Sequence, residues 1–154
     1  MAKARPSKIN KATINNFETS VNSYAGGLLG SANARSSEVK ISNCINEGNI
    51  TTIAQDVAGI LGHQSSYATC SIVNCFNSGN ITNSSANVTG CAAGIATYSC
   101  SMMENCGNSG MIVCENGTAG GISAITLGRT NTNLANAYNT GEIKGGNLAG
   151  GIVA

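Results

Sequence analysis

The chain is 154 residues long and contains 42% hydrophobic, 10% charged and 4% aromatic residues, with 20 Gly, 7 Cys and one Pro. This length fits a single domain, and the low charge argues against intrinsic disorder, because disordered chains carry more charge and fewer apolar residues. A net charge of +1 gives no general reason to expect nucleic acid or an anionic membrane as a partner, and no apolar run is long enough to span a membrane.

Residues 1–10 are predicted to form a basic N-terminal arm outside the folded domain. Four of the eight basic residues lie in or just after it, at Lys3, Arg5, Lys8 and Lys11, which leaves four basic against seven acidic residues in the remainder. No apolar segment follows these charges, so we expect no cleavable secretion signal. Three interpretations of the arm are open: it is disordered, it docks on the acidic body of a neighbouring subunit, or it binds nucleic acid. The lack of aromatic residues for base stacking disfavours the last.

Residues 11–154 are predicted to form one repetitive domain whose first copy is degenerate. A motif with the pattern Asn-x-x-Asn-x-Gly-x-Ile, varied slightly between copies, recurs every 31 residues, and its glycines are Gly48, Gly79, Gly110 and Gly141. A second motif, Ala-Gly-Gly-Ile with variants, alternates with the first. In its third copy, a strict spacing aligns Gly90, whereas the motif itself matches at Gly94. We favour Gly94, which requires four residues inserted before it and four removed after it.

Short apolar stretches separated by Asn-x-Gly and Gly-Gly indicate brief β-strands joined by turns. In one coil we place strands at residues 40–45, 49–53 and 57–61, and a closing loop at residues 63–71. A repeat that cannot bury its own apolar side must stack on its neighbours. We therefore predict an all-β fold, a parallel right-handed β-solenoid of about five 31-residue coils with three short strands per coil.

Columns of identical residues are expected to hold the coils together. The isoleucines predicted to stack in the interior are Ile50, Ile81, Ile112 and Ile143. Two columns of asparagines are predicted to form amide ladders at the spacing of roughly 4.8 Å between strands: Asn43, Asn74, Asn105 and Asn136, and Asn46, Asn77, Asn108 and Asn139. Gly48 and its copies are expected to supply a positive φ at a corner of each coil.

The two alternating motifs resemble the GLUG repeats of bacterial surface proteins, in which Asn-Cys-Tyr-Asn-x-Gly-x-Ile alternates with Gly-Gly-Ile-x-Gly. The resemblance covers roughly residues 25–154. It implies a β-solenoid that serves as stalk or adhesin scaffolding, and it implies no particular activity. The chain departs from the family pattern in residues 1–24, where only a degenerate copy is found, and in carrying no catalytic or binding domain beside the repeats.

The seven cysteines are open to different interpretations. Cys44, Cys75 and Cys106 form a column whose fourth member is Ala137, which favours small buried fillers over disulfides. Four other cysteines lie about one coil apart in pairs and are our disulfide candidates, Cys70 with Cys100 and Cys91 with Cys114. A metal site is disfavoured, because no C-x₂-C pair occurs and His63 is the only histidine.

The sequence predicts neither catalytic residues nor a cofactor site. The seven acidic residues are scattered along the chain, Asp56 is the only aspartate, and His63 is the only candidate base. We interpret His63 as an ordinary loop residue. The calcium-binding solenoid motif G-G-x-G-x-D is absent. We therefore expect a protein that is not an enzyme.

We expect a structural subunit that assembles end to end with copies of itself into an extracellular filament or cell-surface appendage. The chain stops inside the second motif without a capping segment, so either further chain or another subunit is expected to complete this end. The subunit-contact candidates are Lys3, Arg5, Lys8, Lys11, Ile152 and Val153. The alternative is a repeat module of a larger surface adhesin that binds a host glycan or protein. Neither hypothesis involves nucleic acid or a membrane span.

Overall fold

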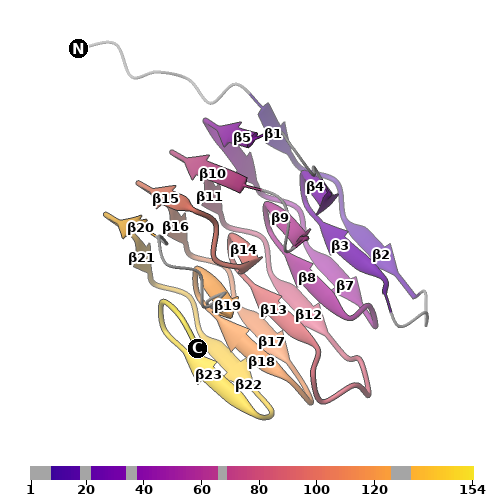
Figure 1. Ribbon diagram of the computed structural model, residues 1–154. Coiled ribbons are helices and arrows are strands. Elements are labelled where there is room, and N and C mark those ends of the chain that lie inside the picture. The colour runs from indigo at the N-terminus through magenta and orange to yellow at the C-terminus, as the bar shows by residue number, and fades with distance from the viewer. Residues whose placement is uncertain (1–7, 18–21, 34–37, 66–68, 126–132) are drawn as a thin grey trace.

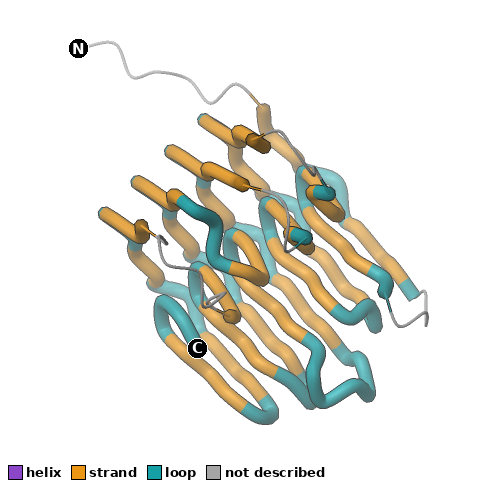
Figure 2. The backbone as a smooth tube through the Cα atoms, viewed as in Figure 1, coloured by secondary structure: helices purple, strands orange, loops and turns teal. Residues whose placement is uncertain are grey.

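The computed structural model describes residues 8–17, 22–33, 38–65, 69–125 and 133–154. Every regular element in these residues is a β-strand (Figure 1, Figure 2), so they contain no helix that could cross a membrane. Consecutive strands along the chain belong to different sheets, and each strand pairs in parallel with the strands one coil before and after it. The prediction of an all-β parallel β-solenoid is therefore confirmed.

The strands form five parallel sheets, which we label A to E. Sheet A contains β1 (Lys8–Asn10), β6 (Cys44–Asn46), β11 (Phe76–Asn77), β16 (Gly107–Asn108) and β21 (Tyr138–Asn139). Sheet B contains β2 (Ile14–Asn16), β7 (Ile50–Thr52), β12 (Ile81–Asn83), β17 (Ile112–Cys114) and β22 (Ile143–Gly145). Sheet C contains β3 (Tyr24–Gly26), β8 (Asp56–Ala58), β13 (Cys91–Ala93), β18 (Thr118–Gly120) and β23 (Leu148–Gly150). Sheet D contains β4 (Leu29–Ala32), β9 (Leu61–Gln64), β14 (Ala96–Tyr98) and β19 (Ser123–Ile125). Sheet E contains β5 (Glu38–Ser42), β10 (Thr69–Val73), β15 (Met102–Glu104) and β20 (Asn133–Ala135).

Three coils contain five strands each, one from every sheet, and a coil of four described strands lies at either end. The chain thus makes about four turns, slightly fewer than the expected five. The first strand begins at Lys8, so the solenoid starts earlier than the predicted boundary at residue 11.

The prediction of three strands per coil is wrong, because a complete coil has five. The segment 40–45 bends at Asn43 and is divided between β5 and β6, and the segment 57–61 is divided between β8 and β9. The predicted loop 63–71 contains the end of β9 and the start of β10.

The corner after sheet E is made by asparagine and not by glycine. Asn43, Asn74, Asn105 and Asn136 have φ between 50° and 55°, a left-handed conformation that asparagine tolerates better than most residues. No described glycine has a positive φ, so that prediction for Gly48 and its copies is wrong. These glycines are required for space, because a Cβ on Gly79 would overlap the carbonyl oxygen of Gly48 in the preceding coil.

The core lies between the sheets in two main compartments. The isoleucines of sheet B pack against the small residues of sheet C, such as Ala92 and Ala119. The thiol column of sheet A packs against sheet E and against Ile60, Ile95 and Ile122, which follow sheet C in each coil. Sheet D covers the other face of sheet C, where Ala58, Ala93 and Ala124 belong to one small cluster of buried residues. Strands β8, β13 and β18 are consequently buried at every position, which explains their small side chains.

The third copy of the second motif aligns at Gly94. Ala93 pairs with Ala58, and the next residues along, Gly94 and Gly59, occupy equivalent places in the stack. The four extra residues lie in the connection between β12 and β13.

Candidate functional site

The two ends of the solenoid are the main candidate for a functional surface. The C-terminal face consists of β20 to β23 and residues 151–154, and these strands are the last described members of their sheets. The N-terminal face consists of β1 to β5, the first described members. Figure 1 shows the two faces at opposite ends of the stack. Parallel strands at a sheet edge present unpaired N–H and C=O groups, which are a template for another β-layer.

Both faces expose apolar side chains that have buried counterparts in the central coils. Leu148 is 55% exposed on the C-terminal face, whereas its counterparts Thr118, Cys91 and Asp56 in the earlier coils are buried. Ile50, Ile81 and Ile112 are fully buried, whereas Ile14 and Ile143, their neighbours in the first and last coils, are only partly buried. A further β-layer at either end would complete their burial.

A buried amide ladder runs through the whole stack beside these isoleucines. Its members are Asn10, Asn46, Asn77, Asn108 and Asn139. In Asn46, Asn77 and Asn108, the Nδ2 donates to the Oδ1 of the next coil at 2.7–2.8 Å and to the glycine carbonyl two residues on, so that both N–H groups are used. The 31-residue period does not reveal Asn10, because this residue lies 36 residues before its partner Asn46. The pattern Asn10-x-Ala12-x-Ile14 could have identified it, because it has the same spacing as Asn46-x-Gly48-x-Ile50.

The ladder has a direction that distinguishes the two faces. Asn10 donates towards the C-terminus to Asn46 Oδ1 at 2.7 Å, and its own Oδ1 faces the N-terminal end, where it accepts from Ala12 N at 3.2 Å. Asn139 Nδ2 donates to Gly141 O at 2.9 Å and, among the described residues, to no other acceptor. A spare amide donor therefore lies at the C-terminal face and an acceptor at the N-terminal face.

A second asparagine column lies on the surface. Asn74, Asn105 and Asn136 each donate to the asparagine of the preceding coil at 3.1–3.2 Å, and this column begins at Asn43. Its bonds are longer and more exposed than those of the buried ladder, and they run in the opposite direction.

A glycine column after sheet C also ends at the C-terminal face. A Cβ on Gly27, Gly59, Gly94 or Gly121 would overlap the carbonyl oxygen of the corresponding glycine in the next coil. Gly151 is the last member, and no described atom lies within 4 Å of the place where its Cβ would stand. The four preceding glycines of the column leave no space for a side chain. Among the described residues, nothing imposes the same steric requirement on Gly151.

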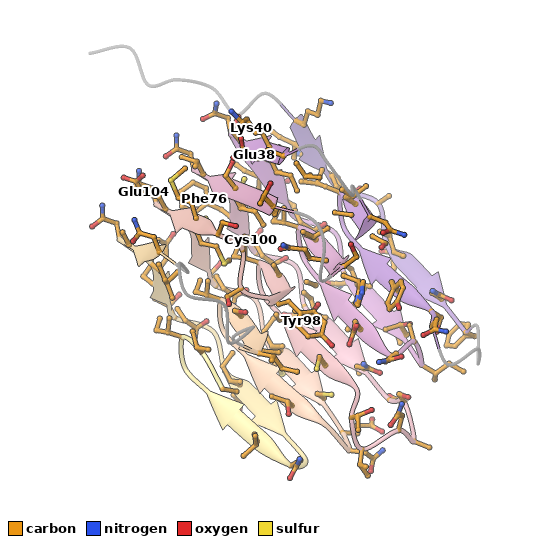
Figure 3. The ribbon with its side chains drawn as sticks, viewed as in Figure 1. Glu38, Lys40, Phe76, Tyr98, Cys100 and Glu104 are labelled. Atoms are coloured by element: carbon orange, nitrogen blue, oxygen red, sulfur yellow. The ribbon has the colours of Figure 1, made fainter. Side chains whose placement is uncertain are left out.

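The predicted subunit-contact residues are distributed over both faces. Lys8 begins β1 and, with Leu29 of β4 and Ile41 of β5, lines a cleft of about 360 Å³. Lys40 also lines this cleft and forms an exposed ion pair with Glu38, with a 3.0 Å N–O distance. Figure 3 labels both side chains. Lys11 pairs with Glu47 at 3.2 Å, also in solvent. Lys3 and Arg5 lie outside the described residues.

At the other face, the two apolar contact candidates hold the chain end onto the coil beneath. Ile152 O accepts hydrogen bonds from Ile122 N and Ser123 N at 2.9 and 3.0 Å. Val153 makes an isolated parallel bridge with Ser123. The chain end thus lies where a further strand of sheet D would pair with β19. The last coil therefore has four strands and, in place of the fifth, this short paired segment.

The predicted disulfides are not formed, because all seven cysteines are free and buried. A hydrogen bond with the Cys70 side chain and burial both raise the pKa of Cys100. Burial, followed by the charge of Asp56, raises the pKa of Cys91, and burial raises that of Cys114 to about 11. Disulfide formation requires a thiolate, so these shifts oppose it. In the column, Cys44, Cys75 and Cys106 donate to the carbonyl two residues earlier at 3.1–3.4 Å.

A buried acid and a base meet between sheets C and D, so the prediction that His63 is an ordinary loop residue is wrong. Asp56 of β8 is fully buried, and its Oδ2 lies 2.7 Å from Nδ1 of His63 on β9. The imidazole stacks on Tyr24 at a centroid distance of 4.0 Å and meets the edge of Tyr98 at 5.3 Å. The sequence feature that indicates this pair is its spacing of seven residues. This spacing places Asp56 and His63 on adjacent strands of one coil, provided that the chain bends within residues 57–61.

The electrostatics of this cluster do not resemble an activated nucleophile. Burial raises the pKa of Asp56, and the hydrogen bond and charge of His63 oppose that rise. The neighbouring thiol of Cys91 has a raised pKa, the opposite of the shift that activates a cysteine. Within the described residues, no group of three or more His, Cys, Asp or Glu side chains could hold a metal ion.

Comparison with known proteins finds no match for this chain among protein-family models, curated proteins or solved structures. The likeness to GLUG repeats therefore rests on the motifs alone.

Proposed function

We propose that this protein is a structural subunit that assembles head to tail through its end faces into an extracellular filament or cell-surface appendage. The observation that carries this proposal is the direction of the buried ladder. The C-terminal face offers the spare Nδ2 donor of Asn139, and the N-terminal face offers the Oδ1 acceptor of Asn10. Joining unlike faces extends the ladder, whereas joining like faces would oppose donor to donor or acceptor to acceptor.

The sheets support the same arrangement. In a head-to-tail joint, β21, β22 and β23 of one copy face β1, β2 and β3 of the next, and these strands belong to the same three sheets. Ile143 would then cover Ile14, extending the row of sheet B isoleucines. A contact between two different faces does not close on itself and so produces an open filament. The extracellular location rests on the resemblance to GLUG repeats. No disulfide is part of the proposal, because all seven thiols are buried.

Gly151 provides the test, because its Cβ position is empty in the single chain and would be occupied in the filament. Its counterpart Gly121 faces Gly151 O, so Gly151 is expected to face Gly27 O of the next copy. We expect the unaltered protein to form filaments at high concentration, seen by electron microscopy and sedimentation velocity. Gly151→Val should abolish them without lowering the unfolding temperature of the monomer.

Val88→Ala is the matched control, since Val88 is an exposed apolar residue on a lateral loop, 64% exposed and away from both faces. This variant should assemble normally. A protein that stays monomeric at high concentration would refute the proposal and leave the adhesin-module alternative. Filaments that persist unchanged in Gly151→Val would exclude the layered joint.

A further inference from the structure

The glycines of the first motif, Gly48, Gly79, Gly110 and Gly141, form a second column, and in the first coil an alanine takes the glycine's place. Asn10 pairs with Asn46 and Ile14 pairs with Ile50, so Ala12 occupies the place that Gly48 occupies in the second coil. Its carbonyl behaves like those of the column, since it accepts a 3.4 Å hydrogen bond from Asn10 Nδ2 as Gly48 O does from Asn46 at 2.8 Å. Ala12 is exposed on the N-terminal face.

The direction of this column makes the alanine significant. A Cβ on Gly48, Gly79, Gly110 or Gly141 would overlap the carbonyl oxygen of the column residue in the preceding coil. In the single chain no described coil precedes Ala12, so its methyl group is accommodated. In a head-to-tail joint, the preceding coil is the last coil of another copy, and the oxygen in that place is Gly141 O.

We infer that Ala12 restrains the end-to-end joint, because its methyl group prevents a second copy from approaching as closely as one internal coil approaches the next. This inference rests on the proposed function and concerns how the assembly of subunits is regulated. The two faces are thus unequally adapted to stacking: Gly151 leaves room for a further layer, whereas Ala12 holds one off. A joint between copies is then weaker than the contact between coils, which limits filament length and lets subunits dissociate.

Ala12→Gly removes the obstacle and Ala12→Val enlarges it. Relief of such an overlap is worth about 1–3 kcal/mol in packed interiors, so we expect Ala12→Gly to lower the critical concentration for assembly at least about fivefold. Ala12→Val should raise it by a similar factor. Light scattering across a dilution series measures both, and electron microscopy measures filament length.

Thr13→Gly is the matched control, because it adds the same backbone freedom one residue away without removing a methyl group from the column. It should leave the critical concentration unchanged. The monomer's unfolding temperature should be nearly the same in all three variants, since both positions are exposed.

The possible results separate this inference from the proposed function. Filaments whose critical concentration does not change in Ala12→Gly would overturn the inference and leave head-to-tail assembly standing with a different joint. Absence of filaments in the unaltered protein and in Ala12→Gly would overturn both. Assembly by Ala12→Gly alone would support the restraint by Ala12 and would refute filament formation by the unaltered chain.

Discussion

At the scale of single residues, the pair of Asp56 and His63 should make the stability of the protein depend on pH. Burial raises the folded-state pKa of Asp56 above its ordinary value of 3.8. A group with a raised folded pKa contributes stability below its unfolded pKa, and this contribution is lost as the pH rises through the folded pKa. His63 limits the loss, because its hydrogen bond and charge favour the ionised carboxylate.

We therefore predict that His63→Ala lowers the free energy of unfolding by about 3 kcal/mol at pH 7, since it leaves a buried carboxylate without its partner. The loss should shrink as the pH falls through the raised folded-state pKa of Asp56, because the buried carboxyl becomes protonated and no longer needs a charged partner. Urea denaturation at a series of pH values measures it. Asp56→Asn combined with His63→Ala is the control and should remove this pH dependence. A cost of His63→Ala that is the same at pH 4 and pH 7 would contradict the assignment.

At the scale of a structural element, the two asparagine columns have the same composition and different energetic roles. Asn77 is buried, donates to Gly79 O at 2.8 Å and to Asn108 Oδ1 at 2.7 Å, and accepts from Asn46. Asn74 is exposed, and its bonds measure 3.2 Å. Water can replace the bonds of the exposed column but not those of the buried one.

We predict that Asn77→Ala lowers the free energy of unfolding by about 3 kcal/mol or more, because it strands a carbonyl, an amide oxygen and an amide N–H in the interior. Asn74→Gly should cost less than about 1 kcal/mol, since glycine retains the left-handed conformation of this corner. Chemical denaturation of both variants measures the difference. Equal losses at the two positions would refute the distinction between the columns.

The strands also show which parts of this fold can be predicted from the sequence. The 31-residue period and the identical isoleucines are sufficient for a parallel solenoid, because a repeat of apolar positions must stack in register. The strand count is not predictable in the same way. The bend at Asn43 depends on one left-handed residue inside a stretch that otherwise favours a single strand. The bend after Ala58 depends on sheet D packing over sheet C, a contact that no local pattern encodes.

The candidate site was predicted in part. The contact candidates Ile152 and Val153 lie beside the last described strands, where they pair with residues 122 and 123. Ala12 and Asn10 were missed because the first coil departs from the 31-residue period, so that their places in the columns emerge only from strand pairing. The proximity of Asp56 and His63 likewise depends on the bend between β8 and β9.

At the scale of the whole molecule, each coil is stabilised by the coils on both sides, so the end coils should be the least protected against local opening. Sheet B shows this coil by coil. The amides of Ile50, Ile81 and Ile112 each donate to a carbonyl of the next coil at 2.8–2.9 Å. For Ile143 the corresponding acceptor would belong to a coil beyond β22, the last described strand of this sheet.

We predict that the Ile143 amide exchanges with solvent deuterium much faster than the Ile112 amide in the monomer, by a factor of about 100 or more. In the filament, Thr13 O of the next copy lies opposite the Ile143 amide, across a joint that Ala12 keeps wider than an internal contact, so that the protection of Ile143 should rise towards that of Ile112 while Ile112 changes little. Hydrogen–deuterium exchange of the unaltered protein below and above its critical concentration measures both amides. Gly151→Val at the higher concentration supplies the comparison, because a protein that cannot add a layer should keep Ile143 in fast exchange. Protection of Ile143 in that variant, or its absence in filaments of the unaltered chain, would show that the subunits join through some other surface.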